Sequence, residues 1–404
     1  PPSSPDRMWP SERRASLALA GIFALRMLGL FLVLPVFALE AARLPGGDDP
    51  ARVGLAMGIY GLAQALLQIP LGLASDRWGR KRVILAGLAL FALGSTLAAT
   101  ASTLDMLTLG RALQGAGAIS AAVTALLADL TRDAVRTKAM ALVGVSIALV
   151  FALSLVAAPP LAAAIGLGGL FWLTGGLALA GMAVVAWVVP PEPPRSTART
   201  PVGLGLVLRH RDLLRLDMGV LTLHTVQMAM WMAVPGLLVG AGIDKAHHWQ
   251  IYLPALLVSF LIMGGLLFRL ERRGHLGAVL RGAIGLLVLA QGGLAWAASH
   301  GADSTLITGV WLLVFFLGFN TLEASQPSLV SRLAPAHARG AALGVYNTLQ
   351  SLGLFAGGAL GGWLMHHGGA ASVFGLGAAL CMLWLVLSWG LRPPTAAPSA
   401  LPQT

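Results

Sequence analysis

Long runs of apolar residues, separated by short polar connections, constrain this sequence more than any other feature. Hydrophobic residues make up 57% of the 404 positions, charged residues make up 11%, and the mean hydropathy is +0.79. One water-soluble core cannot bury that much apolar surface, so the lipid bilayer must act as the solvent for much of the chain. The sequence therefore predicts an all-α membrane protein that crosses the bilayer many times.

About 20 apolar residues are needed for each helical span. On that basis the sequence predicts twelve transmembrane helices, at residues 15–40, 51–75, 82–101, 104–129, 136–163, 168–189, 213–240, 247–270, 275–299, 304–331, 337–365 and 370–391. The first apolar run continues into a span, and no cleavage site of small residues follows a short one, so we expect it to be a retained first helix.

The connection at residues 190–212 is the longest, and it divides the predicted helices into two bundles of six, at 15–189 and 213–391. Its proline-rich start favours extended backbone, and its end, where Arg and His alternate with Leu, favours an amphipathic surface helix. Gly115, Leu130 and Arg136 match Gly318, Leu333 and Arg339 at a constant offset. This internal repeat predicts two pseudo-symmetric halves, an arrangement that alternating-access transporters use.

The formal net charge is +11, and the cations behind it lie at alternate connections between the apolar runs. By the positive-inside rule, the segment 1–14, the linker 190–212 and the disordered-looking tail 392–404 are cytoplasmic. The charge thus reports topology and does not point to nucleic acid. The single cysteine, Cys381, permits no intrachain disulfide, and no His/Cys spacing predicts a metal site. No phosphate-binding loop and no nucleophile–base pair is present, so neither a cofactor nor an enzymatic activity is expected.

The stretch 72–84 places four cations and one carboxylate between two apolar runs. Asp76 falls at the end of the preceding helix, where the helix dipole disfavours a carboxylate, so it needs a partner. Arg80 can hold a carboxylate through two parallel hydrogen bonds, and Gly79 gives the turn backbone freedom. Asp129, at the end of the fourth span, is a second candidate partner. We predict a conformational latch formed by Gly72, Asp76, Arg77, Gly79, Arg80, Asp129 and Arg136; a static anchor is the alternative.

This stretch resembles the signature loop of the major facilitator superfamily of secondary transporters, although Ala74 replaces its usual leucine. The fourth-span sequence 107–117 resembles a second motif of that superfamily, whose arginine, matched by Arg111, is associated with proton coupling. The glycine stripe of the eleventh span resembles a degenerate antiporter motif and includes Gly353, Gly357, Gly358, Gly361 and Gly362. Strings across nearly all spans resemble the YajR branch of proton-driven drug exporters. Named members of that branch carry a small soluble domain after the last helix, and here only the short tail follows.

Few ionisable side chains lie within the predicted spans. Each has an energetic cost in the membrane, so each is expected to have a function or a partner there. Four that fall well inside a span or in a recognisable motif are Arg26 in the first span, Arg111 in the fourth, His224 in the seventh and Glu323 in the tenth. A carboxyl in a low-dielectric cavity and an imidazole can both exchange protons near neutrality. We predict that these four residues couple transport to protons; structural pairing between helices is the alternative.

Polar, aromatic and Met side chains recur at helical spacing on several spans, as expected for the wall of a wet cavity. The predicted substrate cavity is lined by Tyr60, Gln64, Gln68, Gln114, Gln227, Met228, Trp231, Asn320, Tyr346, Asn347 and Gln350. Hydrogen bonding between helices would require the same pattern. The resemblance implies a proton-coupled exporter of small, amphipathic or drug-like solutes, monomeric and located in a bacterial inner membrane. The alternatives are a symporter of a small anion or sugar, a flippase for lipid-like amphiphiles, and a non-transporting receptor built on the transporter fold.

Overall fold

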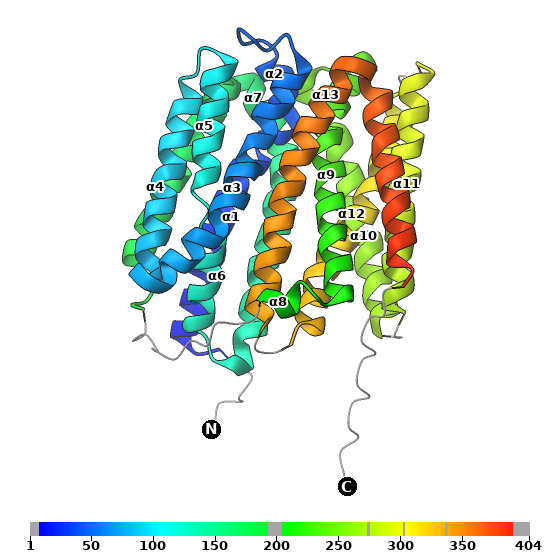
Figure 1. The fold of residues 1–404 in the computed structure, drawn as a ribbon. Helices are drawn as coiled ribbons and strands as arrows, with labels where there is room; N and C mark the ends of the chain where they lie inside the picture. Colours follow the sequence, from blue (N-terminus) through cyan, green and yellow to red (C-terminus); the bar gives the residue numbers. More distant parts are fainter. Residues whose placement is uncertain (1–7, 193–203, 273–274, 302–303, 336–337, 391–404) are drawn as a thin grey trace.

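The computed structural model describes residues 8–192, 204–272, 275–301, 304–335 and 338–390 of the chain. In these ranges the regular structure is helical, as Figure 1 shows. The helices are α1 (Pro10–Phe31), α2 (Leu34–Ala41), α3 (Pro50–Trp78), α4 (Arg80–Ala99), α5 (Leu104–Ala116), α6 (Ser120–Asp129), α7 (Asp133–Trp187), α8 (Leu204–Val207), α9 (Arg211–Gly240), the 3-10 turn η1 (Lys245–His247), α10 (Trp249–Arg272), α11 (Leu276–Ser299), α12 (Thr305–Leu333) and α13 (Arg339–Ser388).

Within the described residues, ten helical segments are long and apolar enough to cross a membrane. Two of them, in α7 and α13, are interrupted by Gly166 and Gly369, whose positive φ angles break the helical backbone. A straight helix as long as α7 would measure about 80 Å, far more than a bilayer core of about 30 Å. Each of these two helices therefore turns back on itself, and the ten segments correspond to twelve crossings. This confirms the predicted all-α membrane fold.

Two predicted spans differ in detail from the structure, because each is built from two helices. In the first span, α1 ends at Phe31 and α2 begins at Leu34, next to Pro35, which lacks the N–H that a continuous helix would use. In the fourth span, α5 ends before Gly117, where a Cβ would lie 2.4 Å from the carbonyl oxygen of Gly87. Close packing against α4 accounts for the break there.

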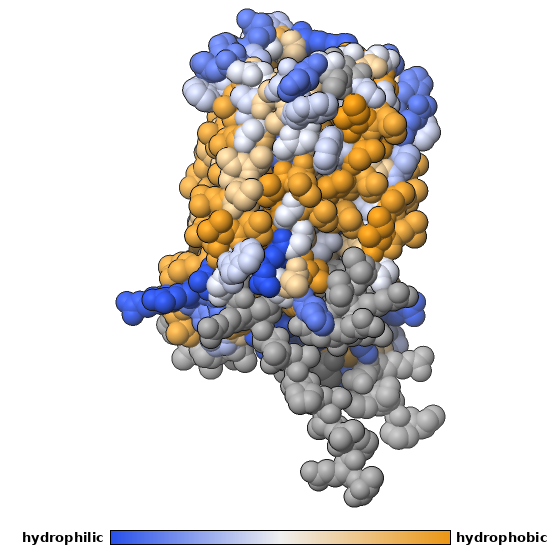
Figure 2. All heavy atoms as spheres, turned by 90° about the vertical axis from the view of Figure 1, so that its right-hand side faces the viewer, coloured by the Kyte–Doolittle hydropathy of each residue, from blue (hydrophilic) through white to orange (hydrophobic). Residues whose placement is uncertain are grey.

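The outer surface carries the apolar belt that a bilayer requires. Figure 2 shows hydrophobic residues around the middle of the visible face and hydrophilic residues at its upper end. Leu66, Leu109, Leu261 and Leu306 are each more than 60% exposed. Such a concentration of exposed large apolar side chains fits a lipid environment and not water.

The first part of α13 is wedged between α3 and α9, as Figure 1 shows. On one side, a Cβ at Gly353 or Gly357 would lie 2.6 or 2.3 Å from backbone oxygens of α9. On the other side, a Cβ at Gly358 or Gly362 would lie within 2.7 Å of the backbone of α3. The predicted glycine stripe is thus the place where backbones from the first and last parts of the chain come closest.

The predicted division into bundles at 15–189 and 213–391 stays a prediction. Much of the predicted linker, at residues 193–203, lies outside the described residues, as do residues 1–7 of the amino-terminal segment and the tail 392–404. Where the linker is described, α8 spans only Leu204–Val207. The first helix begins at Pro10, five residues before the predicted boundary.

Candidate functional site

Three helices bring His224, Glu323 and Gln350 together. His224 Nε2 of α9 lies 3.5 Å from Glu323 Oε2 of α12. Gln350 Nε2 of α13 lies 2.8 Å from His224 Nε2 and 3.4 Å from Glu323 Oε1. His224 Nδ1 lies 3.0 Å from the carbonyl oxygen of Val220. A carbonyl only accepts hydrogen bonds, so Nδ1 carries a proton and Nε2 is the nitrogen that changes when the ring takes up a second proton.

This cluster lies at the edge of the packed interior. The side chain of His224 is 5% exposed, whereas that of Glu323 is 33% exposed. Glu323 Oε2 makes no hydrogen bond although His224 Nε2 is near, which fits a neutral imidazole that offers no donor at Nε2. Protonation of His224 would supply that donor and convert the contact into an ion pair. The arrangement can therefore hold a proton in more than one way.

Arg26 and the polar residues of the second span form a second group in the amino-terminal half. Arg26 donates to Ser120 Oγ and to Gln64 Oε1, each at 2.7 Å, and its side chain is almost fully buried. Gln68 is equally buried, and both atoms of its amide lack a partner among the described residues. Arg26 is thus held by neutral groups inside the helix bundle.

Arg111 is completely buried close to this group. Its Nη1 donates to Gln114 Oε1 at 3.0 Å, and Gln114 in turn donates to Ser95 Oγ. The guanidinium lies 4.9 Å from the ring of Tyr60 and 5.8 Å from that of Phe37. Two of its nitrogens have no hydrogen-bond partner in the described structure. Among the described residues, no hydrogen bond or ion pair joins either arginine to the Glu323 cluster.

Most of the predicted cavity residues are buried in this conformation. Gln227, Met228 and Trp231 all lie inside the packing of α9, and Trp231 contacts the ring of Tyr252 edge to face at 5.5 Å. Asn320 donates to Ser259 Oγ at 3.0 Å. Tyr60 and Tyr346 are also buried, whereas Asn347 and Gln350 are half-buried. The cavity therefore stays a prediction.

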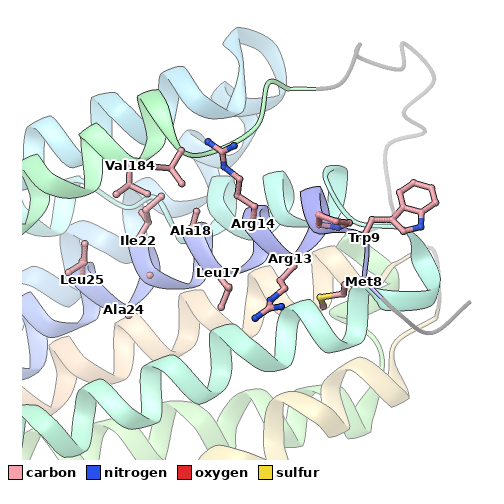
Figure 3. Close-up of a pocket in the computed structure, with 13 residues that line it drawn as sticks. Met8, Trp9, Arg13, Arg14, Leu17, Ala18, Ile22, Ala24, Leu25 and Val184 are labelled. Carbon is pink, nitrogen blue, oxygen red and sulfur yellow. The ribbon is translucent and has the colours of Figure 1, made fainter. Parts of the chain in front are cut away.

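A groove of about 1140 Å³ along α1 and the end of α7 is a different feature. Figure 3 shows Arg13, Arg14 and Trp9 near one end of it and apolar side chains such as Leu17 and Val184 along its length. None of the predicted transport residues lines this groove. Because its walls are apolar and Leu17 is half-exposed, it belongs to the apolar outer surface and not to the polar cluster.

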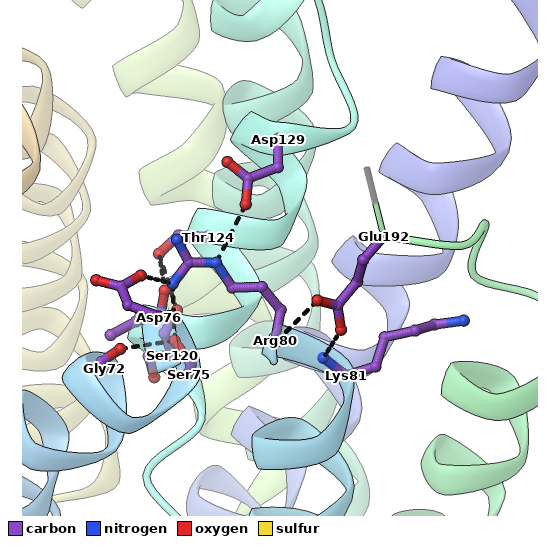
Figure 4. Close-up of polar contacts among 10 residues, drawn as sticks. Gly72, Ser75, Asp76, Arg80, Lys81, Ser120, Thr124, Asp129 and Glu192 are labelled. Atoms are coloured by element: carbon purple, nitrogen blue, oxygen red, sulfur yellow. Dashed lines mark hydrogen bonds and ion pairs between the residues drawn. The ribbon is translucent and has the colours of Figure 1, made fainter. Parts of the chain in front are cut away.

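Arg80 lies at the centre of the predicted latch (Figure 4). Its Nη1 forms an ion pair with Asp76 and donates to Ser75 Oγ, and its Nε lies 3.1 Å from Asp129 Oδ2. The guanidinium is only 8% exposed. Gly79, with a φ of 112°, forms the junction between α3 and α4. One arginine thus connects the ends of the second and fourth spans.

Sequence reasoning missed two contributors to this region. The carboxylate of Glu192 accepts the backbone N–H groups of Arg80 and Lys81, at 3.2 and 2.6 Å, and so satisfies the free donors at the start of α4 (Figure 4). Ser75 holds Arg80 from within α3. The position of Glu192 in a proline-rich linker gave no signal, because capping between distant segments depends on the fold.

Arg136 and Arg132 form contacts beside the latch. Arg136 Nη2 donates to the carbonyl of Ala128 at 3.2 Å, and so satisfies an acceptor at the end of α6. Arg132 pairs with Glu12 of α1 at 2.8 Å and lies 4.0 Å above the ring of Trp9. The Glu12 carboxylate raises the pKa of Arg132 above its ordinary value through a hydrogen bond to the charged guanidinium.

The opposite end of the molecule also holds ion pairs. Lys245 of η1 pairs with Glu40 of α2, and His366 Nδ1 lies 3.0 Å from Asp49 Oδ1. Each pair joins the first part of the chain to the last part. Together with the glycine contacts of α13, they join the two parts of the chain at this end.

Comparison with known proteins agrees with the fold and motifs. The family model described as the Major Facilitator Superfamily matches residues 19–358 and 324–404. The chain belongs to the major facilitator superfamily. This confirms the resemblance found in the sequence motifs. The protein is therefore a membrane transporter and not an enzyme.

Individual transporters are similar to this chain over most of their length. The chain is 43% identical to the inner membrane transport protein YajR of Escherichia coli (strain K12) over 392 residues, which cover 96% of this chain and 85% of that protein. It is 28% identical to the multidrug resistance protein MdtH of Klebsiella pneumoniae (strain 342), covering 93% and 94% of the two chains. The structure of the human organic anion transporter MFSD10 shares its fold, with a TM-score of 0.70 and 20% identity over 94% of this chain and 100% of that one.

Proposed function

We propose that this protein is a proton-coupled exporter of small, amphipathic or drug-like solutes that works by alternating access. The observation that carries the proposal is the contact between His224, Glu323 and Gln350. It supplies two titratable groups within reach of each other where three helices meet. The similarity to a multidrug resistance protein supports export of such solutes.

The proton chemistry follows from the two titratable side chains. With His224 neutral, Gln350 donates to its Nε2, and Glu323 is the group that can bind a proton. When a solute enters, displacement of that proton would restore the carboxylate, which a cationic solute would favour and an anionic one would oppose. Competition between a proton and a solute for one carboxylate is sufficient to exchange them across the membrane.

The energy available from protons is adequate for this exchange. One elementary charge moving down 100 mV yields about 2.3 kcal/mol, and each unit of pH difference adds about 1.36 kcal/mol. Since 1.4 kcal/mol corresponds to a tenfold change in an equilibrium constant, one proton can sustain a large solute gradient. No nucleotide is needed.

The two ends of the molecule would open in turn. In the conformation described, Glu40–Lys245 and Asp49–His366 join the two parts of the chain at one end. We assign this end to the outer face of a bacterial inner membrane and both termini to the cytoplasm, on the basis of the positive-inside rule. Glu323 would then exchange protons with the cytoplasm in this conformation. A monomer contains the complete set of these groups.

An anion symporter would need exposed cations in its cavity. Arg26 and Arg111 are buried here, and both are engaged by neutral side chains. This favours a positioning role for the two arginines over a role in binding an anionic substrate, and so favours the exporter.

The test is proton movement in liposomes that contain the purified protein, with ethidium, a lipophilic cation, as the probe. An ethidium gradient should drive protons in the opposite direction. Glu323→Gln removes the carboxylate and should slow this proton flux about 100-fold, the lower end of what a positioned acid–base group supplies. His224→Ala should slow it less and alter its pH dependence.

Asp105→Asn is the matched control, because it neutralises a carboxylate that is 80% exposed and should leave the flux unchanged. Proton flux that persists in Glu323→Gln, or ethidium movement in the same direction as protons, would contradict the proposal.

A further inference from the structure

Asp217 is a buried carboxyl that neither the sequence motifs nor the Glu323 cluster accounts for. It lies in α9, 1% exposed, and neither of its oxygens has a hydrogen-bond partner among the described residues. A charged carboxylate in such surroundings is costly unless it is paired. At membrane depth, an ionisable residue of this kind is a functional candidate by default.

Asp217 and His224 lie on one face of α9, seven residues or two helical turns apart. This step covers about 10 Å along the helix axis. His210, seven residues before Asp217, caps the start of α9: its backbone is extended, and its Nδ1 accepts the backbone N–H of Leu213. His210 lies half-buried at the start of α9, at the end of the molecule that holds the termini, and His224 lies in the Glu323 cluster.

The helices packed against α9 continue this series toward Glu323. Tyr346 of α13 lies within electrostatic range of both Asp217 and Glu323. Its hydroxyl donates to Gln326 Oε1 at 3.4 Å, and Gln326 lies one turn after Glu323 on α12. The amide nitrogen of Gln326 is buried without a partner, like the oxygens of Asp217. Buried polar atoms of this kind are the sites that internal water molecules bind.

We propose that Asp217 is a second proton-binding site, which exchanges protons with Glu323 by a route separate from the path of the solute. The proposal rests on the proposed proton-coupled export. In each transfer Asp217 gives up its proton and becomes a carboxylate, and the carboxylate of Glu323 takes the proton up. The hydroxyl of Tyr346, which the sequence assigned to the cavity wall but which is buried in the helix packing here, and internal water carry the proton across the intervening distance. His210 and solvent then reload Asp217.

A separate route has a clear physical advantage. Glu323 is partly exposed, so a bound solute that covers it would also block its access to protons. Asp217 is enclosed by protein, so a bound solute does not cover it. It can therefore still exchange protons through neighbouring side chains while the solute is bound. Among titratable groups, Tyr346 on α13 lies within electrostatic range of Asp217, and His224 lies two helical turns further along α9.

The test compares two transport assays in liposomes, again with ethidium. One assay drives ethidium with a pH difference, and the other follows exchange of labelled for unlabelled ethidium at equal pH, which needs no net proton movement. Asp217→Asn keeps the side-chain volume and should abolish the pH-driven transport while the exchange stays at the wild-type rate. Asp217→Glu should restore the pH-driven transport.

Thr225→Val is the matched control on the same helix. Its hydroxyl already donates to the carbonyl of Leu221 within α9, so its removal should leave both assays unchanged. A second readout is the infrared absorption of protonated carboxyl groups. Wild-type protein should show a component that is absent in Asp217→Asn and separate from the component that Glu323→Gln removes.

The outcomes separate the two proposals. If wild-type protein shows no pH-driven ethidium transport, proton-coupled export is wrong, and so is the proton transfer from Asp217 to Glu323, called here the relay. If a pH difference drives ethidium transport by the wild type and by Asp217→Asn equally, the relay alone is wrong. Loss of both assays in Asp217→Asn would make Asp217 a structural residue and would also overturn the relay, as would an unchanged carboxyl absorption.

Discussion

At the scale of single residues, the planar guanidinium of Arg80 explains why this position is an arginine. It reaches Asp76 and Ser75 through Nη1 and Asp129 through Nε at the same time. A lysine has a single nitrogen on a flexible stem and cannot satisfy three partners in this fixed geometry. The carboxylates that Arg80 holds also lie at the ends of helices, where they would otherwise be disfavoured.

We expect Arg80→Lys to lower the free energy of unfolding by about 1.5–3 kcal/mol, the range for one hydrogen bond to a charged group. The measurement is thermal unfolding of the purified protein in detergent. Arg52→Lys is the control, because Arg52 pairs with Asp105 at a site where both side chains are well exposed, and exposed pairs contribute only about 0–1 kcal/mol. Equal effects of the two substitutions would contradict the argument.

The sequence motif predicted that Asp76 and Asp129 are partners of Arg80, but not that Ser75 and Glu192 contribute to the same region. The spacing from Asp76 to Arg80 is local, so a helical turn is enough to predict that contact. Glu192 reaches the start of α4 from 112 residues away. No periodicity in a proline-rich segment encodes such a contact.

At the scale of elements, the glycines of α13 decide how closely the two parts of the chain approach. A Cβ at Gly358 would lie 2.6 Å from the carbonyl oxygen of Gly54 and 2.7 Å from the backbone of Gly58. Backbone atoms cannot turn aside as a side chain can, so the helices themselves must separate. At Gly344 of the same helix, a Cβ would meet nothing within 4 Å.

This contrast makes a paired prediction. Gly358→Ala should separate α3 from α13 and weaken closure at the end that holds Glu40 and Lys245. Hydrogen–deuterium exchange in residues 54–61 should then rise. Gly344→Ala should leave the exchange unchanged, since the added methyl group meets open space. A rise in both variants, or in neither, would show that the glycine contacts do not control closure.

At the scale of the whole molecule, backbone packing and polar side-chain contacts join the two parts of the chain at the end that holds Glu40 and Lys245. The ion pair Glu40–Lys245 and the polar contact between Asp49 and His366 add to the backbone packing of α3 and α13. A transporter must break such contacts in each cycle, so small groups of them suit a reversible closure.

Lys245→Gln should therefore shift the molecule toward conformations in which this end is open. Exchange of backbone hydrogens in α2 and η1 should increase. His247→Gln is the control from the same turn, because His247 is 58% exposed and lies 3.9 Å from Asp244, a partner within its own segment. Unchanged exchange in Lys245→Gln would argue against a closing role for this ion pair.

The sequence by itself determined that the lipid bilayer surrounds the chain, that the chain crosses it twelve times and which family it belongs to, because long apolar runs and local motifs depend only on spacing along the chain. It missed the breaks after Phe31 and Ala116, the cap supplied by Glu192 and the isolated position of Asp217. Only the tertiary structure decided which polar groups meet. His224, Glu323 and Gln350 come from three helices, and the burial of a side chain depends on every neighbour that packs around it.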